Sequence, residues 1–129
     1  MQIHQSAEDY LETILMLTQR MGKVRSIDVV NELGFTKASV SIAMKKLREN
    51  GYIAVDGEGN LTLLEPGREI AERIYSRHRL LNHFFVQLGV DEKTAAEDAC
   101  KAEHILSEQT LEKIREKALQ ADAEQNDPE

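Results

Sequence analysis

The strongest constraint on the fold lies between residues 26 and 64, where two short helical segments are followed by two strand-forming segments. Ser26 and Thr36 can cap helices over residues 27–33 and 37–50, because a side-chain hydroxyl can accept a hydrogen bond from an exposed backbone N–H of the first helical turn. A glycine follows each helix, where it favours termination. Only a few residues separate the two helices, which is typical of a helix-turn-helix.

The strand-forming segments cover residues 52–55 and 61–64, and the sequence Asp-Gly-Glu-Gly-Asn between them has the composition of a hairpin turn. A further helix is expected over residues 7–21, capped by Ser6 and ended by Gly22. A helix, a helix-turn-helix and a hairpin in this order predict a winged helix-turn-helix.

The remainder of the chain predicts helices only. One helix begins at Pro66 and ends near residue 88, and another is capped by Asp91 and carries residues 100–104. A last helix is capped by Ser107 and ends near residue 119. The expected fold is therefore mainly α. The expected domains are a winged-helix domain over residues 1–65, an all-α dimerisation and metal-binding domain over residues 66–119, and an acidic disordered tail over residues 120–129.

The charge is distributed unevenly along the chain, although its net value is −7. Residues 18–50 hold seven Lys and Arg against three acidic residues, whereas residues 91–129 hold twelve acidic residues against five basic ones. A basic half joined to an acidic half favours a DNA-binding module attached to a second domain. Ordinary solvated helix faces would explain the same counts.

The second helix of the helix-turn-helix divides into two faces. Val40, Met44 and Leu47 recur at helical spacing and are expected to pack inward. Small residues near the start of the other face would allow a close approach to double-stranded DNA, and the basic residues would contact its phosphates. The residues expected to contact DNA are Arg25, Thr36, Lys37, Ala38, Ser39, Ser41, Ile42, Lys45 and Lys46.

A second signal is the spacing Cys100-x-x-Glu103-His104. On one helix these three side chains would share a face, and thiolate, carboxylate and imidazole together suit a divalent transition metal. Asp9 and Glu12 share a face of the first helix, and His78 lies on the long helix. Each residue also has a structural reading: acidic residues suit a first helical turn, and single His or Cys side chains are common in cores.

Bulk features favour a cytoplasmic protein with no membrane partner, because no apolar run approaches the roughly 20 residues of a membrane span and a signal-peptide pattern is absent. An enzyme acting on a small organic substrate is not expected, since Cys100 and His104 lack a third orienting group. A homodimer is expected, because several apolar residues exceed the needs of one small domain: Phe84, Phe85, Leu88, Ile105, Leu106 and Leu111.

The sequences RHRLL at residues 77–81 and DACKAEHILS at residues 98–107 resemble the diphtheria-toxin-repressor family of iron- and manganese-dependent regulators. The resemblance runs from about residue 7 to 117 and implies a repressor that binds a palindromic operator as a dimer when loaded with metal. The chain ends where longer members continue into an SH3-like domain, so the short form is implied. The family's metal ligands fall on Asp9, Glu12, His78, Cys100, Glu103 and His104.

The implied metal is Fe²⁺ or Mn²⁺. Asp9 is typical of the manganese branch, whereas Cys100 is typical of the iron branch. Asn82 and Ala96 replace two ligands of a second site in the iron branch, which puts that site in doubt. The thiolate favours Fe²⁺, with Mn²⁺ a close alternative, and Zn²⁺ or Co²⁺ would bind in vitro. Two other readings stay open, a winged-helix regulator of a non-metal signal and an interaction module that binds no DNA.

Overall fold

The computed structural model describes residues 5–125 of the chain, and side chains from residue 6 to residue 124. The chain forms two compact units. We call the part that ends at Arg73 the winged-helix unit and the part that begins at Ile74 the helical unit. The division falls inside helix α4 (Glu65–Gln87), beyond the expected boundary after residue 65.

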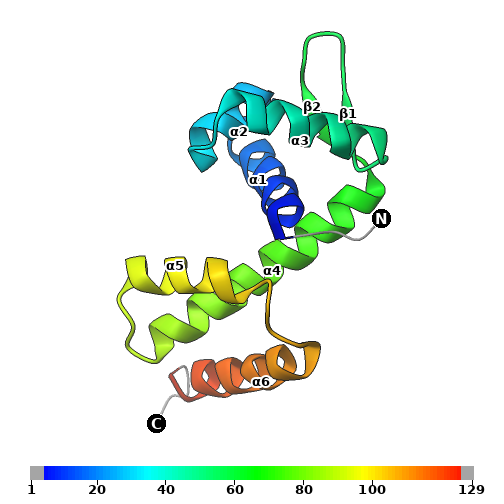
Figure 1. Cartoon of the computed structure of the whole chain (residues 1–129). Coiled ribbons are helices and arrows are strands. Elements are labelled where there is room, and N and C mark those ends of the chain that lie inside the picture. Colours follow the sequence, from blue (N-terminus) through cyan, green and yellow to red (C-terminus); the bar gives the residue numbers. More distant parts are fainter. Residues whose placement is uncertain (1–4, 126–129) are drawn as a thin grey trace. The chain divides into compact units, whose positions relative to one another are not determined.

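The winged-helix unit is built from three helices and a two-stranded hairpin before α4 begins (Figure 1). The strands are antiparallel, with Ile53 opposite Leu63 and Val55 opposite Leu61. This arrangement confirms the predicted winged helix-turn-helix. The elements are α1 (Gln5–Met21), α2 (Ser26–Leu33), α3 (Lys37–Glu49), β1 (Ile53–Val55) and β2 (Leu61–Leu63).

The core of this unit is made of large aliphatic side chains. Leu11 and Ile14 of α1 are wholly buried, and Val40, Met44 and Leu47 of α3 are buried as the helical spacing predicted. The first turn of α4 also packs tightly. A Cβ at Gly67 would lie 2.2 Å from the carbonyl oxygen of Tyr52, so only glycine fits at this point of contact.

In the winged-helix unit, two of the predicted helix caps are wrong and one is confirmed. Thr36 caps α3, since its hydroxyl oxygen accepts a hydrogen bond from Ser39 N at 3.1 Å. Ser26 is instead the first residue of α2, and Ser6 lies inside α1. The backbone of Arg25 forms a β-bridge with Asn60 and is extended, and its N–H donates to the Asp28 carboxylate at 2.9 Å. Helix α2 can therefore begin directly after Arg25.

The helical unit contains the rest of α4, then α5 (Glu92–Ala102) and α6 (Glu108–Gln125). The predicted caps Asp91 and Ser107 are confirmed, because their side chains accept from Thr94 N at 3.1 Å and Thr110 N at 3.2 Å. No helix in the described part of the chain is long and apolar enough to cross a membrane.

The prediction of a disordered tail from residue 120 is wrong as far as residue 125, and residues 126–129 lie outside the described part. Helix α6 continues to Gln125, and its second half packs and forms hydrogen bonds within the helical unit. Ala118 is buried, and the Gln87 amide of α4 donates to the Ala118 carbonyl at 3.3 Å and to the Asp122 carboxylate at 2.7 Å.

The core of the helical unit centres on Leu81, Ala99 and Leu111, one residue from each helix. Leu111 is 2% exposed, so the expectation that it is available to a second subunit is wrong. Leu88 and Ile105, from the same expected set, are 65% and 76% exposed. The partly buried residues that pack against this core are Leu80, Phe85, Ala102, Leu106 and Ile114.

Candidate metal centre and DNA-binding surface

The predicted Cys100, Glu103 and His104 trio does not share one helical face. Helix α5 ends at Ala102, Glu103 is its C-terminal cap, and His104 lies in the following turn. Ile105 N and Leu106 N both donate to the Ala102 carbonyl, at 3.1 and 3.2 Å. These two hydrogen bonds form a tight turn directly after the helix. Cys100 is exposed, whereas the side chains of Glu103 and His104 are 0% and 2% exposed.

The buried carboxylate of Glu103 is the centre of the polar cluster in the helical unit. Its Oε2 atom lies 2.9 Å from Nδ1 of His78 on α4, and its Oε1 atom lies 3.4 Å from Nε2 of His104. Oε1 accepts no hydrogen bond from the described residues. A buried carboxylate is costly unless a cation or hydrogen bonds satisfy it.

These residues fit a divalent transition metal. Glu103 offers a buried oxygen atom without a donor, and two imidazole rings flank it. Carboxylate and imidazole are common ligands of Mn²⁺, Fe²⁺ and Zn²⁺. A cation would satisfy the Oε1 atom, which accepts no hydrogen bond from the described residues.

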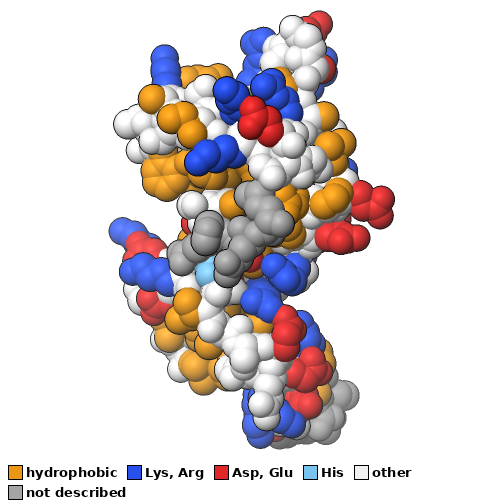
Figure 2. Space-filling model, turned by 45° about the vertical axis from the view of Figure 1, so that its right-hand side comes forward, with side chains coloured by type: hydrophobic (Ala, Val, Ile, Leu, Met, Phe, Trp, Pro, Cys, Tyr) orange, Lys and Arg blue, Asp and Glu red, His pale blue; other side chains and the backbone are white. Residues whose placement is uncertain are grey.

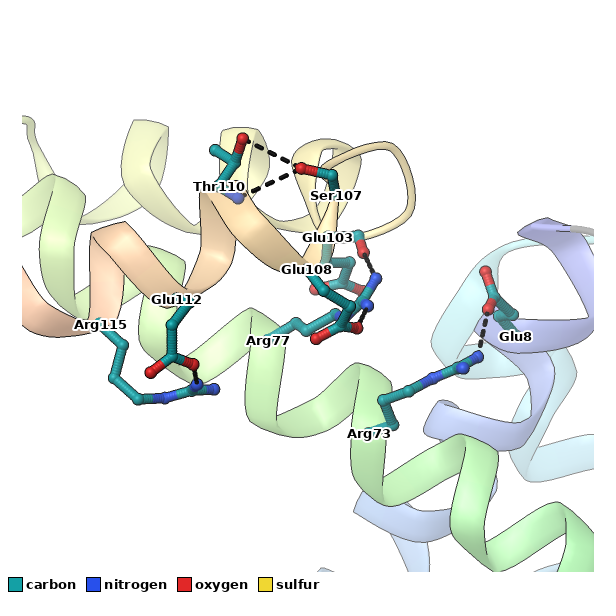
Figure 3. Close-up of polar contacts among 9 residues, drawn as sticks. All are labelled: Glu8, Arg73, Arg77, Glu103, Ser107, Glu108, Thr110, Glu112 and Arg115. Carbon is teal, nitrogen blue, oxygen red and sulfur yellow. Dashed lines mark hydrogen bonds and ion pairs between the residues drawn. The ribbon is translucent and has the colours of Figure 1, made fainter.

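The winged-helix unit contributes its predicted acidic residues on α1. Glu12 is only 6% exposed and Asp9 is half-buried, and their spacing puts both carboxylates on one face of the helix. Burial raises the pKa of Tyr10, and the negative charge of the adjacent Asp9 raises it further. Glu8 in the same turn forms an ion pair of 3.2 Å with Arg73 of α4, which Figure 3 shows.

Sequence analysis missed a role for Arg77, the residue before His78. Its Nη1 atom donates to the backbone carbonyl of Glu103 at 3.2 Å, and its Nη2 atom donates to the carboxylate of Glu108 at the start of α6 (Figure 3). The Arg77 side chain is mostly buried. Both partners are distant in the sequence, so a single sequence offers no signal for these contacts.

The predicted DNA-binding face of α3 is exposed throughout. Ile42 is 58% exposed on this face. Lys45 and Lys46 are exposed beside it, and Figure 2 shows Lys and Arg side chains gathered over the winged-helix unit. This surface combines basic groups with small and apolar ones, as direct contact with DNA requires.

The hairpin is fastened to the start of α2 by Arg25. The guanidinium group of Arg25 donates a hydrogen bond to the Glu58 carbonyl at the tip of the hairpin. Within the tip, the Asp56 carboxylate accepts from Asn60 N at 2.8 Å and Glu58 N at 2.9 Å. These N–H groups, with the Asn60 side chain, lower the pKa of Asp56. Arg25 thus lies beside the wing, with part of its donor capacity used there.

Two family models match successive parts of the chain. Residues 2–61 match the family described as iron dependent repressor, N-terminal DNA binding domain. Residues 64–122 match iron dependent repressor, metal binding and dimerisation domain. An HTH-type transcriptional regulator of Methanocaldococcus jannaschii is 38% identical over 86% of this chain and 90% of its own. The chain belongs to the iron-dependent repressor family.

Other members of the iron-dependent repressor family are similar over most of the chain. The HTH-type transcriptional regulator MntR of Bacillus subtilis is 34% identical over 84% of this chain and 77% of its own. Among solved structures, a manganese-dependent transcriptional repressor in complex with manganese is 30% identical over 87% of this chain, with a TM-score of 0.79. The manganese regulator SloR is 26% identical over 94% of this chain, with a TM-score of 0.76.

The chain spans only 52% and 55% of the lengths of those two solved chains. The comparisons confirm the resemblance to metal-dependent repressors and the winged-helix fold, and they place this chain among transcription regulators rather than enzymes. The individual metal-binding and DNA-binding residues stay predictions.

Proposed function

We propose that this protein is a cytoplasmic repressor that binds a palindromic operator as a homodimer when it holds Fe²⁺ or Mn²⁺. The observation that carries the proposal is the buried Glu103 carboxylate between two imidazole rings, with one oxygen atom left unsatisfied. The same chain presents an exposed basic and apolar face on α3. One unit is thus equipped for metal and the other for DNA.

The proposed ligands come from both units, and the family resemblance supports this set: Asp9, Glu12, His78, Cys100, Glu103 and His104. A bound divalent ion supplies positive charge to these carboxylates and neutral imidazoles. Glu103 would bind the ion through carboxylate oxygen, and His78 and His104 would bind it through the nitrogen atoms of their imidazole rings. Cys100 would contribute as a thiolate, which favours Fe²⁺ over Mn²⁺.

The proposed operator contacts follow the two kinds of side chain on the winged-helix unit. The four basic residues would neutralise phosphates and fix the register of α3, while the small and apolar residues would face base edges. The proposed contact residues are Arg25, Thr36, Lys37, Ala38, Ser39, Ser41, Ile42, Lys45 and Lys46. Because one recognition helix reads few bases, two copies would read the two half-sites of a palindrome.

Since the ligand set includes α1 of the winged-helix unit and residues of the helical unit, metal and operator affinity should be coupled. Without the cation, the carboxylates of Asp9, Glu12 and Glu103 would repel one another. By linkage, metal and DNA raise each other's affinity by the same factor. Allosteric coupling of about 1–3 kcal/mol would change operator affinity about 5- to 150-fold.

The test begins with selection of a binding site from random DNA in the presence of Mn²⁺. Operator affinity is then measured by fluorescence anisotropy at fixed salt, with Mn²⁺, with Fe²⁺ under anaerobic conditions, and with chelator. We expect the chelated protein to bind about 5- to 150-fold more weakly. Equal affinities would contradict metal sensing and favour a regulator of another signal. No DNA binding even at low salt would favour an interaction module.

The identity of the metal is tested at Cys100. Anaerobic titration with Co²⁺ should give an intense thiolate-to-cobalt charge-transfer band that is absent from Cys100→Ser. Cys100→Glu replaces the soft ligand with a hard one and should shift the preference from Fe²⁺ toward Mn²⁺. Cobalt binding without the band would exclude Cys100 as a ligand and leave the harder, manganese-like site.

A further inference from the structure

Glu103 is held at two points by two consecutive residues of α4. His78 contacts its carboxylate, with 2.9 Å between Nδ1 and Oε2, and Arg77 donates to its backbone carbonyl at 3.2 Å. The carbonyl at a helix C-terminus has no partner within the helix, so an arginine there both satisfies a hydrogen bond and complements the helix dipole. The backbone and the side chain of Glu103 are therefore fixed independently.

The same guanidinium group also fixes the next helix. Its Nη2 atom donates to Glu108, the first residue of α6, so Arg77 joins the end of α5 to the beginning of α6 (Figure 3). The segment between these two anchors, residues 103–107, carries both Glu103 and His104. Arg77 is 14% exposed at its side chain, whereas Glu108 is 78% exposed. The contact reaches from the buried turn to the surface.

We propose that Arg77 is a positioning residue for metal binding, which it promotes by holding the residue 103–107 turn against α4 with the help of Glu108. This inference rests on the proposed function, since it assigns a role toward the same metal. The hydrogen bonds of Arg77 go to the Glu103 backbone and to Glu108, so Arg77 acts on Glu103 through its backbone. Loss of Arg77 would leave the turn free to rotate the Glu103 carboxylate away from His78.

The charge of Arg77 makes the proposal sharply testable. A guanidinium group near a cation site repels the cation, so removing it by charge alone would strengthen metal binding. Removing a positioning contact would weaken metal binding, and residues that orient metal ligands commonly contribute about 10- to 100-fold in affinity. The two explanations therefore predict opposite signs for Arg77→Gln.

The experiment measures the affinity of the full chain for Mn²⁺ by competition with a chromophoric chelator, and the visible spectrum of its Co²⁺ complex. We expect Arg77→Gln to bind about 10- to 100-fold more weakly, with a changed cobalt spectrum. Arg77→Lys keeps the positive charge, but a single ammonium group cannot replace the two guanidinium nitrogens that donate to Glu103 and Glu108. This variant should therefore lose part of the Mn²⁺ affinity. Glu108→Gln should give a smaller loss.

The matched control is Arg115→Gln, which removes another arginine–glutamate contact of α6, 2.9 Å long, that does not involve Glu103 (Figure 3). It should leave both readouts unchanged. Thermal unfolding of the metal-free variants identifies any that fail to fold, and Glu108→Gln tests the contact from its exposed side. Unchanged or tighter Mn²⁺ binding by folded Arg77→Gln, with wild-type binding intact, overturns this inference alone. No binding by the wild type overturns the proposed function as well.

Discussion

The two units differ in the side chains that they bury in their small cores. Among the described residues, the winged-helix unit buries large aliphatic side chains from α1, α3 and the hairpin, such as Leu11, Ile14 and Ile53. The helical unit buries three large aliphatic residues and three alanines, and adds the wholly buried Glu103. Burial of apolar area stabilises the first unit directly. The second unit buries a carboxylate whose Oε1 atom accepts no hydrogen bond from the described residues, and such burial costs stability unless a cation satisfies the oxygen.

We expect metal to stabilise the helical unit more than the winged-helix unit, because Glu103 is wholly buried whereas Glu12, the buried carboxylate of the winged-helix unit, is 6% exposed. A unit whose folding free energy depends on a ligand reports the concentration of that ligand. The DNA-binding unit needs no such dependence, because its surface for DNA is present on a folded α3. The four predictions below test this comparison.

The largest effect is expected from a cavity in the smaller core. Leu111→Ala should lower the free energy of unfolding of the helical unit by about 2–5 kcal/mol, the usual range for a buried leucine. Leu47→Ala is the matched substitution in the winged-helix unit. Urea unfolding with hydrogen exchange should show that Leu111→Ala unfolds the helical unit first while α1 to β2 stay protected. Loss of protection in both units at once would break the comparison.

The next effect concerns the buried charge itself. Glu103→Gln should abolish the rise in unfolding free energy that Mn²⁺ gives the wild type, about 2.7 kcal/mol at a metal concentration 100 times the Kd. The metal-free variant should be at least as stable as the metal-free wild type, because no buried charge is left unpaired. Thermal unfolding with and without Mn²⁺ measures both. The exposed Glu97→Gln on α5 is the control and should behave as wild type.

A smaller effect is expected at the DNA-binding surface. The exposed Ile42 is suited to apolar contact with the methyl group of thymine. Replacing thymines of the selected operator by deoxyuridine, one position at a time, should weaken wild-type binding about fourfold at one position, or about 0.8 kcal/mol for one buried methyl group. Ile42→Ala should be insensitive to that replacement. Lys45→Ala should weaken binding to both DNAs equally, and a methyl preference kept by Ile42→Ala would exclude the contact.

The smallest effect is a pH dependence confined to the wing. The pKa of Asp56 is lowered in the folded protein from its ordinary 3.8 by the Asn60 N–H and side chain. A lowered pKa contributes stability that is present above about pH 4 and is lost as the pH falls through the folded value. The protection of the Glu58 and Asn60 amides against hydrogen exchange, relative to their intrinsic rates at each pH, should therefore fall in acid more than that of other amides in the hairpin. Asp56→Asn should remove this dependence, and an unchanged acid profile in that variant would contradict it.

Features encoded within a few residues were predictable from the sequence. The caps at Thr36, Asp91 and Ser107, the hairpin and the inward face of α3 depend on local hydrogen bonds or on helical spacing. The start of α2 was misplaced because the extended backbone of Arg25 depends on Asn60. The end of α6 was misplaced for a similar reason, since polar contacts to Gln87 of α4 accompany its continuation.

The candidate metal centre was predictable in composition but not in geometry. Residue types and spacing singled out Cys100, Glu103 and His104, yet they assumed one continuous helix. The helix ends at Ala102, so the exposed Cys100 and the buried pair Glu103 and His104 have different surroundings. The contacts of Arg77 depend on how three helices pack, which local sequence does not encode.

Gly67 has a consequence for how this sequence can change. An alanine is ordinarily favoured over glycine inside a helix by about 1 kcal/mol, yet a Cβ here would overlap the Tyr52 carbonyl. Every amino acid that a single nucleotide change can produce from a glycine codon carries a Cβ. No single substitution at position 67 therefore fits the present backbone. Evolution can replace this glycine only after other substitutions have moved the chain around Tyr52.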